Sequence, residues 1–237
     1  MGKTIVIIGA GPGVGFAVAQ RFGKEGYNVA LLARSKEKLD DLVKQLEAQE
    51  ISVASFYADV LDRNSLKAAL SAVKKHFGSI DVIEFSPTPS METMRTPRNI
   101  DVENAAFHLD FQLLSAITVV QAVLPDMLSK KEGSLLFTTA SSAQKPTSLT
   151  ASFGIAAGAL LNYIRVLNND LLSENIFAGI VSIGGLVYNT NEPDQELLKH
   201  FPQGMPAISS REVAETHWKM HSEKKENEMI LGKTFSF

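Results

Sequence analysis

A short apolar run, Thr4–Ile8, leads directly into the glycine-rich segment Gly9-Ala-Gly-Pro-Gly-Val-Gly15 and then into a stretch with helical character. A strand joined to a helix by a tight glycine-rich turn restricts the chain to folds built from strand–helix units. The alternation continues to the end of the sequence. It predicts strands at 3–8, 28–32, 53–58, 80–85, 134–139, 177–183 and 229–231, and helices at 15–24, 36–49, 63–77, 102–128, 151–172 and 211–220.

This alternation is typical of an α/β protein with a doubly wound parallel sheet, the Rossmann arrangement, here with about seven strands. No linker, short repeat or low-complexity stretch interrupts the pattern, so we expect one dinucleotide-binding type domain over 1–237. Pro125 is expected to bend or end the helix at 102–128, because proline cannot donate the helical hydrogen bond.

Composition narrows the functional classes. The 237 residues carry a formal net charge of -3, which gives no basic field for nucleic acid, and we expect no nucleic-acid partner. There is no cysteine, which excludes disulfides, thiolate catalysis and cysteine-bound metals. We find no continuous apolar run of about 18 residues, so the sequence predicts no membrane span and a cytoplasmic protein.

Two segments break the alternation. Ser86–Ile100 contains three prolines, and 186–210 contains asparagine, proline and glycine. Long loops of this kind often cover a substrate, and we expect 186–210 to be a substrate loop or lid. Plain surface connections are an equally good interpretation of either segment taken alone. Their methionine and phenylalanine content indicates partly apolar walls for a substrate pocket.

The glycine segment has the character of a phosphate-binding turn. Gly9, Gly13 and Gly15 form a G-x-x-x-G-x-G pattern, with Gly11 in addition. Glycine permits a tight turn, a close approach of the backbone to phosphate, and close packing of the helix on the strand, while the helix N-terminus faces the anion. A tight turn without a ligand is the alternative. Because the pattern lies between a strand and a helix, binding of a dinucleotide is favoured.

The end of the second predicted strand bears on the choice of dinucleotide. It reads Ala-Arg34-Ser-Lys36, without the carboxylate that would bind a ribose 2′-hydroxyl. A guanidinium suits a 2′-phosphate, so NADP(H) is favoured over NAD(H); a solvated arginine is the alternative. Asp59 follows the third strand. Its carboxylate is a candidate acceptor for the adenine amino group, and it could equally cap the next helix or hold the loop.

The chain resembles the short-chain dehydrogenase/reductase family along nearly its whole length. The segments that carry the resemblance are 9–15, 33–34, 58–60, 80–83, 123–127, 133–139 and 175–185. The resemblance implies a nicotinamide cofactor and a homodimer or homotetramer formed through the two long helices. It also implies cofactor contacts from Gly9, Gly11, Gly13, Val14, Gly15, Arg34, Ser35, Asp59, Val60, Ser86, Gly184 and Val187.

The catalytic residues of that family are not matched. The family uses Asn, Ser, Tyr and Lys, with tyrosine as the proton donor and lysine four residues later lowering its pKa. In this chain Phe153 stands at the tyrosine position, Ala157 at the lysine position and Gln112 at the asparagine position. A hydroxyl survives near Ser141. Ser141 and Gln112 are therefore the candidate catalytic residues.

Substitute donors are few. Tyr163 lies ten residues after Phe153 and should face elsewhere on the helix. Further candidates are Tyr188, Lys145, Gln144 and His108, each also readily explained as a surface or packing residue.

Three histidines in the C-terminal part of the sequence are candidate metal ligands. His217 and His221 are four residues apart on one predicted helix, and His200 lies in the loop before it. No carboxylate–histidine motif accompanies them, so we predict no metal and interpret the pair as part of an exposed helical face. Trp218 is expected in the core or at a subunit interface.

Two functional hypotheses follow. In the first, the protein is an oxidoreductase that transfers hydride to a small carbonyl, enone or imine substrate with unusual proton donation, because the cofactor supplies the hydride chemistry. In the second, it is a non-catalytic NADP(H)-binding sensor or partner subunit that keeps the binding half and has lost the Tyr/Lys chemistry.

Overall fold

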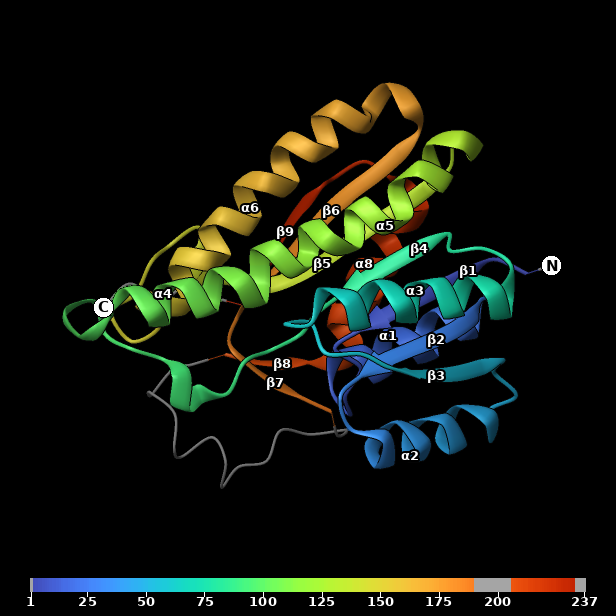
Figure 1. The fold of residues 1–237 in the computed structure, drawn as a ribbon, viewed down its shortest axis with the longest axis horizontal. Helices are drawn as coiled ribbons and strands as arrows, with labels where there is room; N and C mark the ends of the chain where they lie inside the picture. Colours follow the sequence, from blue (N-terminus) through green and yellow to red (C-terminus); the bar gives the residue numbers. More distant parts are fainter. Residues whose placement is uncertain (1, 190–205, 233–237) are drawn as a thin grey trace.

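The computed structural model describes residues 2–189 and 206–232. Within them a seven-stranded parallel sheet has the order β3-β2-β1-β4-β5-β6-β9 (Figure 1). The strands are β1 (Thr4–Ile8), β2 (Asn28–Ala33), β3 (Val53–Tyr57), β4 (Val82–Phe85), β5 (Gly133–Ala140), β6 (Ile176–Gly184) and β9 (Glu228–Gly232). This order confirms the predicted α/β Rossmann arrangement, in which successive strands are added in one direction from β1 to β3 and in the opposite direction from β4 onward.

Helices cover both faces of the sheet (Figure 1). Residues of α1 (Val14–Gly23), α2 (Lys36–Glu47) and α8 (Ser210–Glu223) pack in one hydrophobic cluster. Those of α3 (Arg63–Phe77), α5 (Ser115–Lys130) and α6 (Ala151–Leu171) pack in the other. Because both faces of the strands are covered, strands such as β1 read as unbroken apolar runs and are buried throughout.

The long helix differs from the prediction. α4 (Val102–Leu109) continues through a π-helical turn at Asp110–Leu114 into α5, and α5 runs past Pro125 to Lys130. Pro125 therefore does not end the helix. The continuous stretch Val102–Lys130 is long and apolar enough to cross a membrane by length and composition, but half of its most apolar window is buried inside the protein. A core helix has the same properties.

The two segments that break the alternation contain short regular elements. The 86–100 segment contains 3₁₀ turns at Met91–Thr93 and Pro97–Asn99. The two ends of the 186–210 segment, β7 (Leu186–Tyr188) and β8 (Ala207–Ser209), pair as a small parallel sheet that the sequence did not predict. The remainder of the predicted lid, 190–205, lies outside the described residues, as does His200.

Candidate dinucleotide site

The glycine turn is held between three strands. The amides of Gly9 and Ala10 both donate to the Leu32 carbonyl, each at 3.0 Å. Gly9 has a φ of +88°, and a Cβ atom there would lie 2.6 Å from the Pro87 Cα. Only glycine fits this position, because a side chain would meet backbone and the conformation is left-handed.

The later glycines have different roles. A Cβ on Gly15 would lie 3.1 Å from the Ala10 Cα and the Ile7 Cγ2, so this glycine permits close packing of α1 on β1. A Cβ on Gly13 would have no atom of the described residues 2–189 and 206–232 within 4 Å. α1 begins at Val14, and the Phe16 amide donates to the Gly11 carbonyl at 3.0 Å. The open side of the turn and the helix N-terminus together form a cradle for an anion.

A cavity of about 230 Å³ opens beside this turn. Its polar wall comes from Arg34, Ser35 and Lys38 at the start of α2, and its other lining residues include Gly9, Val60, Pro87 and Phe111. Ser35 caps α2 by accepting from the Lys38 amide. Lys36, which the sequence offers beside Arg34 as a second cation, does not line the cavity. Lys38 was missed, and its place one helical turn after the cap residue is the signal that could have found it.

Asp59 serves the loop in the structure. Its Oδ1 accepts from the Leu61 amide at 3.0 Å, whereas α3 is capped by Asp62, which accepts from the amides of Asn64 and Ser65. The alternative that Asp59 caps the next helix is therefore wrong, and the alternative that it holds the loop is correct. Asp59 does not line the cavity, although its neighbours Ala58 and Val60 do.

The residues at the presumed catalytic positions lie together and are buried. Phe153 is 9% exposed and Ala157 is fully buried. The side-chain amide of Gln112 donates to the Phe153 carbonyl at 3.4 Å, and the rings of His108 and Phe153 are 6.3 Å apart. The structure therefore brings Gln112 and His108 to the Phe153 position, which offers a phenyl ring instead of a phenol.

Two serines lie at the end of β5, in a 3₁₀ turn at Ser141–Ala143. Ser141 and Ser142 are both buried, and the hydroxyl of Ser142 has no hydrogen-bond partner among the described residues. A Cβ on Gly154 of α6 would lie 3.5 Å from the Ser142 Cβ, so this turn faces the helix that carries Phe153. An unpaired buried hydroxyl is a candidate for contact with a ligand.

The substitute donors considered above have other surroundings. Gln144 donates to the Ser182 hydroxyl at 2.8 Å and to Glu228 at 3.1 Å. Lys145 is exposed. Tyr163 packs against the core cluster of α3, α5 and α6, and Tyr188 belongs to β7. The remaining predicted cofactor residues lie at the end of β6, where Gly184 pairs with Gly232 of β9, and in β7, where Val187 pairs with Ile208.

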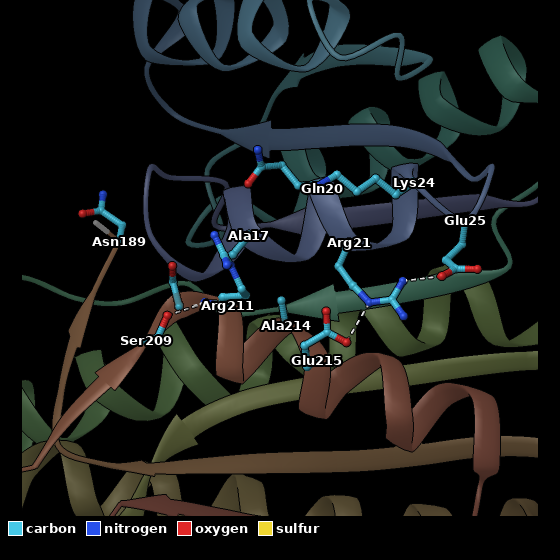
Figure 2. A pocket seen from close by; sticks show the side chains of 11 residues that line it. Ala17, Gln20, Arg21, Lys24, Glu25, Asn189, Ser209, Arg211, Ala214 and Glu215 are labelled. Carbon is cyan, nitrogen blue, oxygen red and sulfur yellow. Dashed lines mark hydrogen bonds and ion pairs between the residues drawn. The ribbon is translucent and has the colours of Figure 1, made fainter. Parts of the chain in front are cut away.

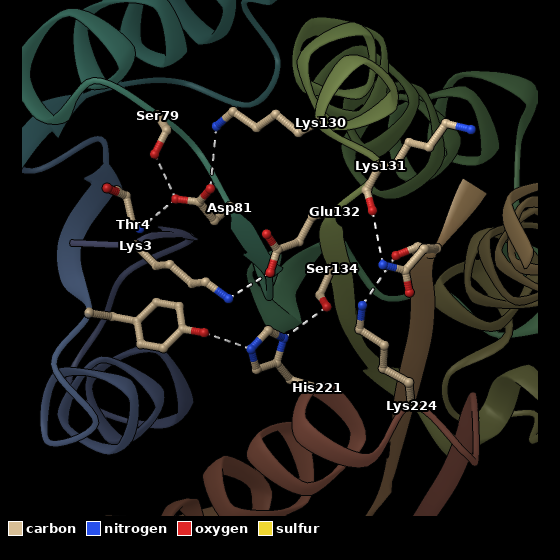
Figure 3. A network of polar contacts seen from close by, with 12 residues as sticks. Lys3, Thr4, Ser79, Asp81, Lys130, Lys131, Glu132, Ser134, His221 and Lys224 are labelled. Atoms are coloured by element: carbon tan, nitrogen blue, oxygen red, sulfur yellow. Dashed lines mark hydrogen bonds and ion pairs between the residues drawn. The ribbon is translucent and has the colours of Figure 1, made fainter. Parts of the chain in front are cut away.

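The interpretation of His217 and His221 as an exposed face is wrong. His217 is fully buried, and its Nε2 lies 2.8 Å from the Thr138 hydroxyl. His221 is bonded on both ring nitrogens, to the Tyr27 hydroxyl and to the Ser134 hydroxyl, each at 2.8 Å (Figure 3). The residues that the structure describes contain no group of three or more metal-binding side chains. Trp218 is partly buried and packs edge-on against Phe22, at the margin of the cluster formed by α1, α2 and α8.

Glu84 is not among the residues that the sequence predicts for the site. This carboxylate is fully buried in β4, where Ser86 donates to its Oε2 at 2.9 Å and Thr138 donates to its Oε1 at 3.0 Å. His217 Nε2 lies 3.9 Å from Oε1. Burial raises the pKa of Glu84 to about 7 and lowers that of His217 to about 3. A glutamate between Ile83 and Phe85, in an otherwise apolar strand, is the sequence feature that could have identified this buried carboxylate.

Two larger cavities lie away from the glycine turn. One, about 560 Å³, runs between α1 and α8, where Arg21 bonds both Glu25 and Glu215 and thereby fastens the two helices (Figure 2). The other, about 580 Å³, is lined by Pro97 and Ile100 from the 86–100 segment and by residues of 146–155, including Pro146 and Ile155. The second cavity adjoins the turn before α6 and has largely apolar walls.

The geometry fits part of a dinucleotide. The cavity beside Gly9 is smaller than a typical site for a whole ligand, and its size and basic wall suit the adenosine half. The open glycine turn leads from that cavity to the N-terminus of α1, where a pyrophosphate would meet backbone N–H groups. Arg34 and Lys38 would hold a 2′-phosphate at the rim.

Comparisons with known proteins agree with this geometry. An uncharacterized oxidoreductase from Staphylococcus epidermidis is 26% identical over 182 residues, which cover 77% of each chain. The 3-oxoacyl-[acyl-carrier-protein] reductase of Staphylococcus aureus is 24% identical over 204 residues, covering 84% of this chain and 80% of the reductase.

Solved structures share the fold. L-Sorbose reductase from Gluconobacter frateurii, in complex with NADPH and L-sorbose, matches with a TM-score of 0.85 and 20% identity over 98% of this chain and 96% of the reductase. A 7α-hydroxysteroid dehydrogenase complexed with NADH matches with a TM-score of 0.84 and 18% identity, over 97% of this chain and 92% of the other. The sequence matches the short chain dehydrogenase family over residues 3–196. The protein is therefore a member of the short-chain dehydrogenase family.

Proposed function

We propose that this protein binds NADP(H) and transfers hydride to or from a small carbonyl, enone or imine substrate, with proton donation that does not use the family's tyrosine. The observation that carries the proposal is the intact cradle: Gly9 closed against Pro87, an open turn at Gly13, and a cavity with Arg34 and Lys38 at its rim. Membership of an oxidoreductase family supports the reaction class.

The preference for NADP(H) rests on charge. Arg34 and Lys38 line the cavity beside the end of β2, and none of its lining residues in the described part of the chain is acidic. Cations at this edge favour a 2′-phosphate, whereas a carboxylate there would favour a free 2′-hydroxyl. Relatives of similar fold have been solved with NADPH and with NADH, so the choice belongs to the residues at the rim.

Proton transfer must use another group, because Phe153 has no acidic hydrogen. When bound, the nicotinamide would supply or accept the hydride. The polar groups near the Phe153 position include the amide of Gln112, the ring of His108 and the hydroxyls of the adjacent turn, Ser141 and Ser142. They suit orientation of a substrate oxygen or of a water molecule. A substrate whose reduced form is a stabilised carbanion would need less acid assistance at oxygen. The apolar cavity at Pro97 and Ile155 is the proposed substrate side.

A second candidate function is supported by the same pair of positions. Phe153 and Ala157, both buried, stand at the positions that the resemblance assigns to the family's tyrosine and lysine. Their side chains are apolar. A non-catalytic NADP(H)-binding sensor or partner subunit would have this combination of an intact cradle and an apolar catalytic position. It requires binding without turnover, and a change of shape or assembly on binding.

The first experiment is a titration of the purified protein with NADPH and with NADH. Arg34→Ala and Lys38→Ala are expected to weaken NADPH about tenfold each and to change NADH little, because hydrogen bonds to a charged phosphate are lost. Lys36→Ala is the matched control, since Lys36 is an exposed lysine of the same helix outside the cavity. Absence of binding by either nucleotide would refute both candidate functions.

Turnover then separates the two candidates. The protein with bound NADPH is mixed with panels of ketones, enones and imines, and NADPH oxidation is followed by its absorbance. Hydride transfer to any panel member supports the oxidoreductase. Tight binding without transfer to any of them supports the sensor or partner.

We also propose a homodimer or homotetramer formed through α5 and α6. Both helices carry exposed apolar side chains, among them Leu128 of α5, which is 37% exposed, and Val166 of α6, which is 61% exposed. Surfaces of this kind are typical of subunit contacts.

A further inference from the structure

A chain of hydrogen bonds connects α8 with the glycine turn through the centre of the sheet. It runs from His217 to Thr138 of β5, then to Glu84 of β4, and ends at Ser86. Glu84 lies opposite Ile7 of β1 and Leu136 of β5 and has no exposed surface. A buried carboxylate among apolar strands is costly, and every partner that it has is part of this chain.

The position of each hydrogen follows from His217. Its Nδ1 has no hydrogen-bond partner among the described residues, whereas its Nε2 is 2.8 Å from the Thr138 hydroxyl. An orphaned buried N–H group is rarer than an unused lone pair, so the proton belongs on Nε2. His217 then donates to Thr138, and the single hydroxyl hydrogen of Thr138 donates to Oε1 of Glu84. Any proton on Glu84 must therefore lie on Oε2, which faces Ser86.

Ser86 lies against the glycine turn. Its amide donates to the Ile8 carbonyl at 2.9 Å, and a Cβ on Gly9 would lie 2.9 Å from the Ser86 carbonyl carbon. The side chain has one hydroxyl hydrogen to give. When Glu84 is ionised, that hydrogen is donated inward to Oε2. When Oε2 carries a proton, it donates to the Ser86 oxygen instead, and the serine hydrogen is free to point outward.

We propose that Glu84 is a positioning residue of the dinucleotide site, whose protonation decides whether Ser86 offers a hydrogen-bond donor to the bound nucleotide. The inference rests on the proposed NADP(H) function. The pyrophosphate oxygens are ionised and carry no hydrogen, so they only accept hydrogen bonds, and the protonated state of Glu84 binds the nucleotide more tightly. The negative charge of the ionised state acts in the same direction, because it repels the phosphates.

The titration of Glu84 has a simple setting among the described residues. Neighbouring strands β1 and β5 contribute no titratable side chain, and α8 contributes His217. Arg21 of α1 is committed to Glu25 and Glu215, and His221 of α8 to Tyr27 and Ser134. Burial raises the pKa of Glu84 to about 7, so the change falls within the range that a binding experiment can cover.

The test is a double-mutant cycle in which the dissociation constant of NADPH is measured between about pH 6 and about pH 8. Its members are wild type, Glu84→Gln, Ser86→Ala and the double variant. In Glu84→Gln the amide nitrogen faces Ser86, because Thr138 needs an acceptor, and the variant imitates the protonated state at every pH. We expect wild type to bind about fivefold more weakly than Glu84→Gln at the higher pH and equally at the lower pH. In the Ser86→Ala background this hydrogen-bond difference should disappear.

Ser134→Ala is the control for loss of any buried hydroxyl from β5, since Ser134 is fully buried and bonds to His221. It should leave the pH dependence of binding unchanged. If Glu84→Gln does not fold, Ser86→Ala should reduce the pH dependence of NADPH binding relative to Ser134→Ala, leaving only the part due to the charge of Glu84. Equal pH dependence in Ser86→Ala and Ser134→Ala would refute the role of the serine.

The outcomes separate the two levels of inference. If wild type binds neither nucleotide, the proposed function fails and this inference fails with it. If wild type binds NADPH but Glu84→Gln has the same pH profile, only the role of Glu84 is refuted. A Glu84→Gln effect that persists undiminished in the Ser86→Ala background would also refute it, since the effect would not act through the serine.

Discussion

His221 should make the folded protein sensitive to mild acid. Its ring forms hydrogen bonds with Tyr27, which directly precedes β2, and with Ser134 of β5, at the amino ends of the strands (Figure 3). Burial, and then the charges of Lys224 and Lys3, lower its pKa from 6.5 to about 4. Since the unfolded chain takes up this proton at a higher pH than the folded protein does, the contribution of His221 to stability is lost as the pH falls below about 6.5.

The size of the effect follows from linkage. Between pH 7 and pH 5, a histidine with these two pKa values costs about 2 kcal/mol of folding free energy. His217, with a pKa lowered to about 3, costs about 2 kcal/mol more over the same range. Glu84 acts oppositely, because a pKa raised to about 7 lets the folded protein take up the proton first and gain about 2 kcal/mol. The effects of His217 and Glu84 on the folding free energy therefore nearly cancel between pH 7 and pH 5. The net loss of stability from these three groups is then about that of His221 alone.

The assay is urea unfolding at pH 7 and pH 5, with the change in unfolding free energy compared between variants. His221→Gln should lose about 2 kcal/mol less than wild type, and Glu84→Gln about 2 kcal/mol more. His76→Gln, at an exposed position of α3, is the control and should behave as wild type. Equal acid losses in wild type, His221→Gln and Glu84→Gln would refute the reasoning.

Three further predictions concern the site and the assembly. Gly9→Ala should destabilise the fold by about 2 kcal/mol or more and weaken NADPH binding, because its Cβ meets the Pro87 backbone at positive φ; unchanged thermal unfolding would contradict this. Phe153→Tyr combined with Ala157→Lys should create or increase ketone reduction by NADPH. Phe153→Tyr alone should do so weakly, since the lysine lowers the pKa of the phenol. A double variant that folds, binds NADPH and reduces no ketone would show that more of the site has changed. Val166→Asp should lower the mass observed by light scattering if α6 forms a subunit contact, and an unchanged oligomer would place the contact elsewhere.

The site itself could be foreseen in part. The glycine pattern predicts the turn, and Gly15 packs α1 on β1 as the pattern required. Arg34 lines the cavity as expected, but its neighbour there is Lys38, because the rotation of α2 about its axis, set by packing on the sheet, decides which lysine reaches the rim. Asp59 and Asp62 compete for the same cap, and the position at which α3 begins decides between them.

The sequence by itself determined the fold class, since the alternation of apolar strands and amphipathic helices allows few other arrangements. It also located the glycine turn, and it predicts Phe153 and Ala157 at the tyrosine and lysine positions, because both are read from local segments of the chain. Tertiary structure alone decided the environment of the polar side chains. Thr138 meets Glu84 from 54 residues away and His217 from 79 residues away. A helical histidine is buried or exposed according to the face that the sheet covers, and that face is fixed only when the layers pack.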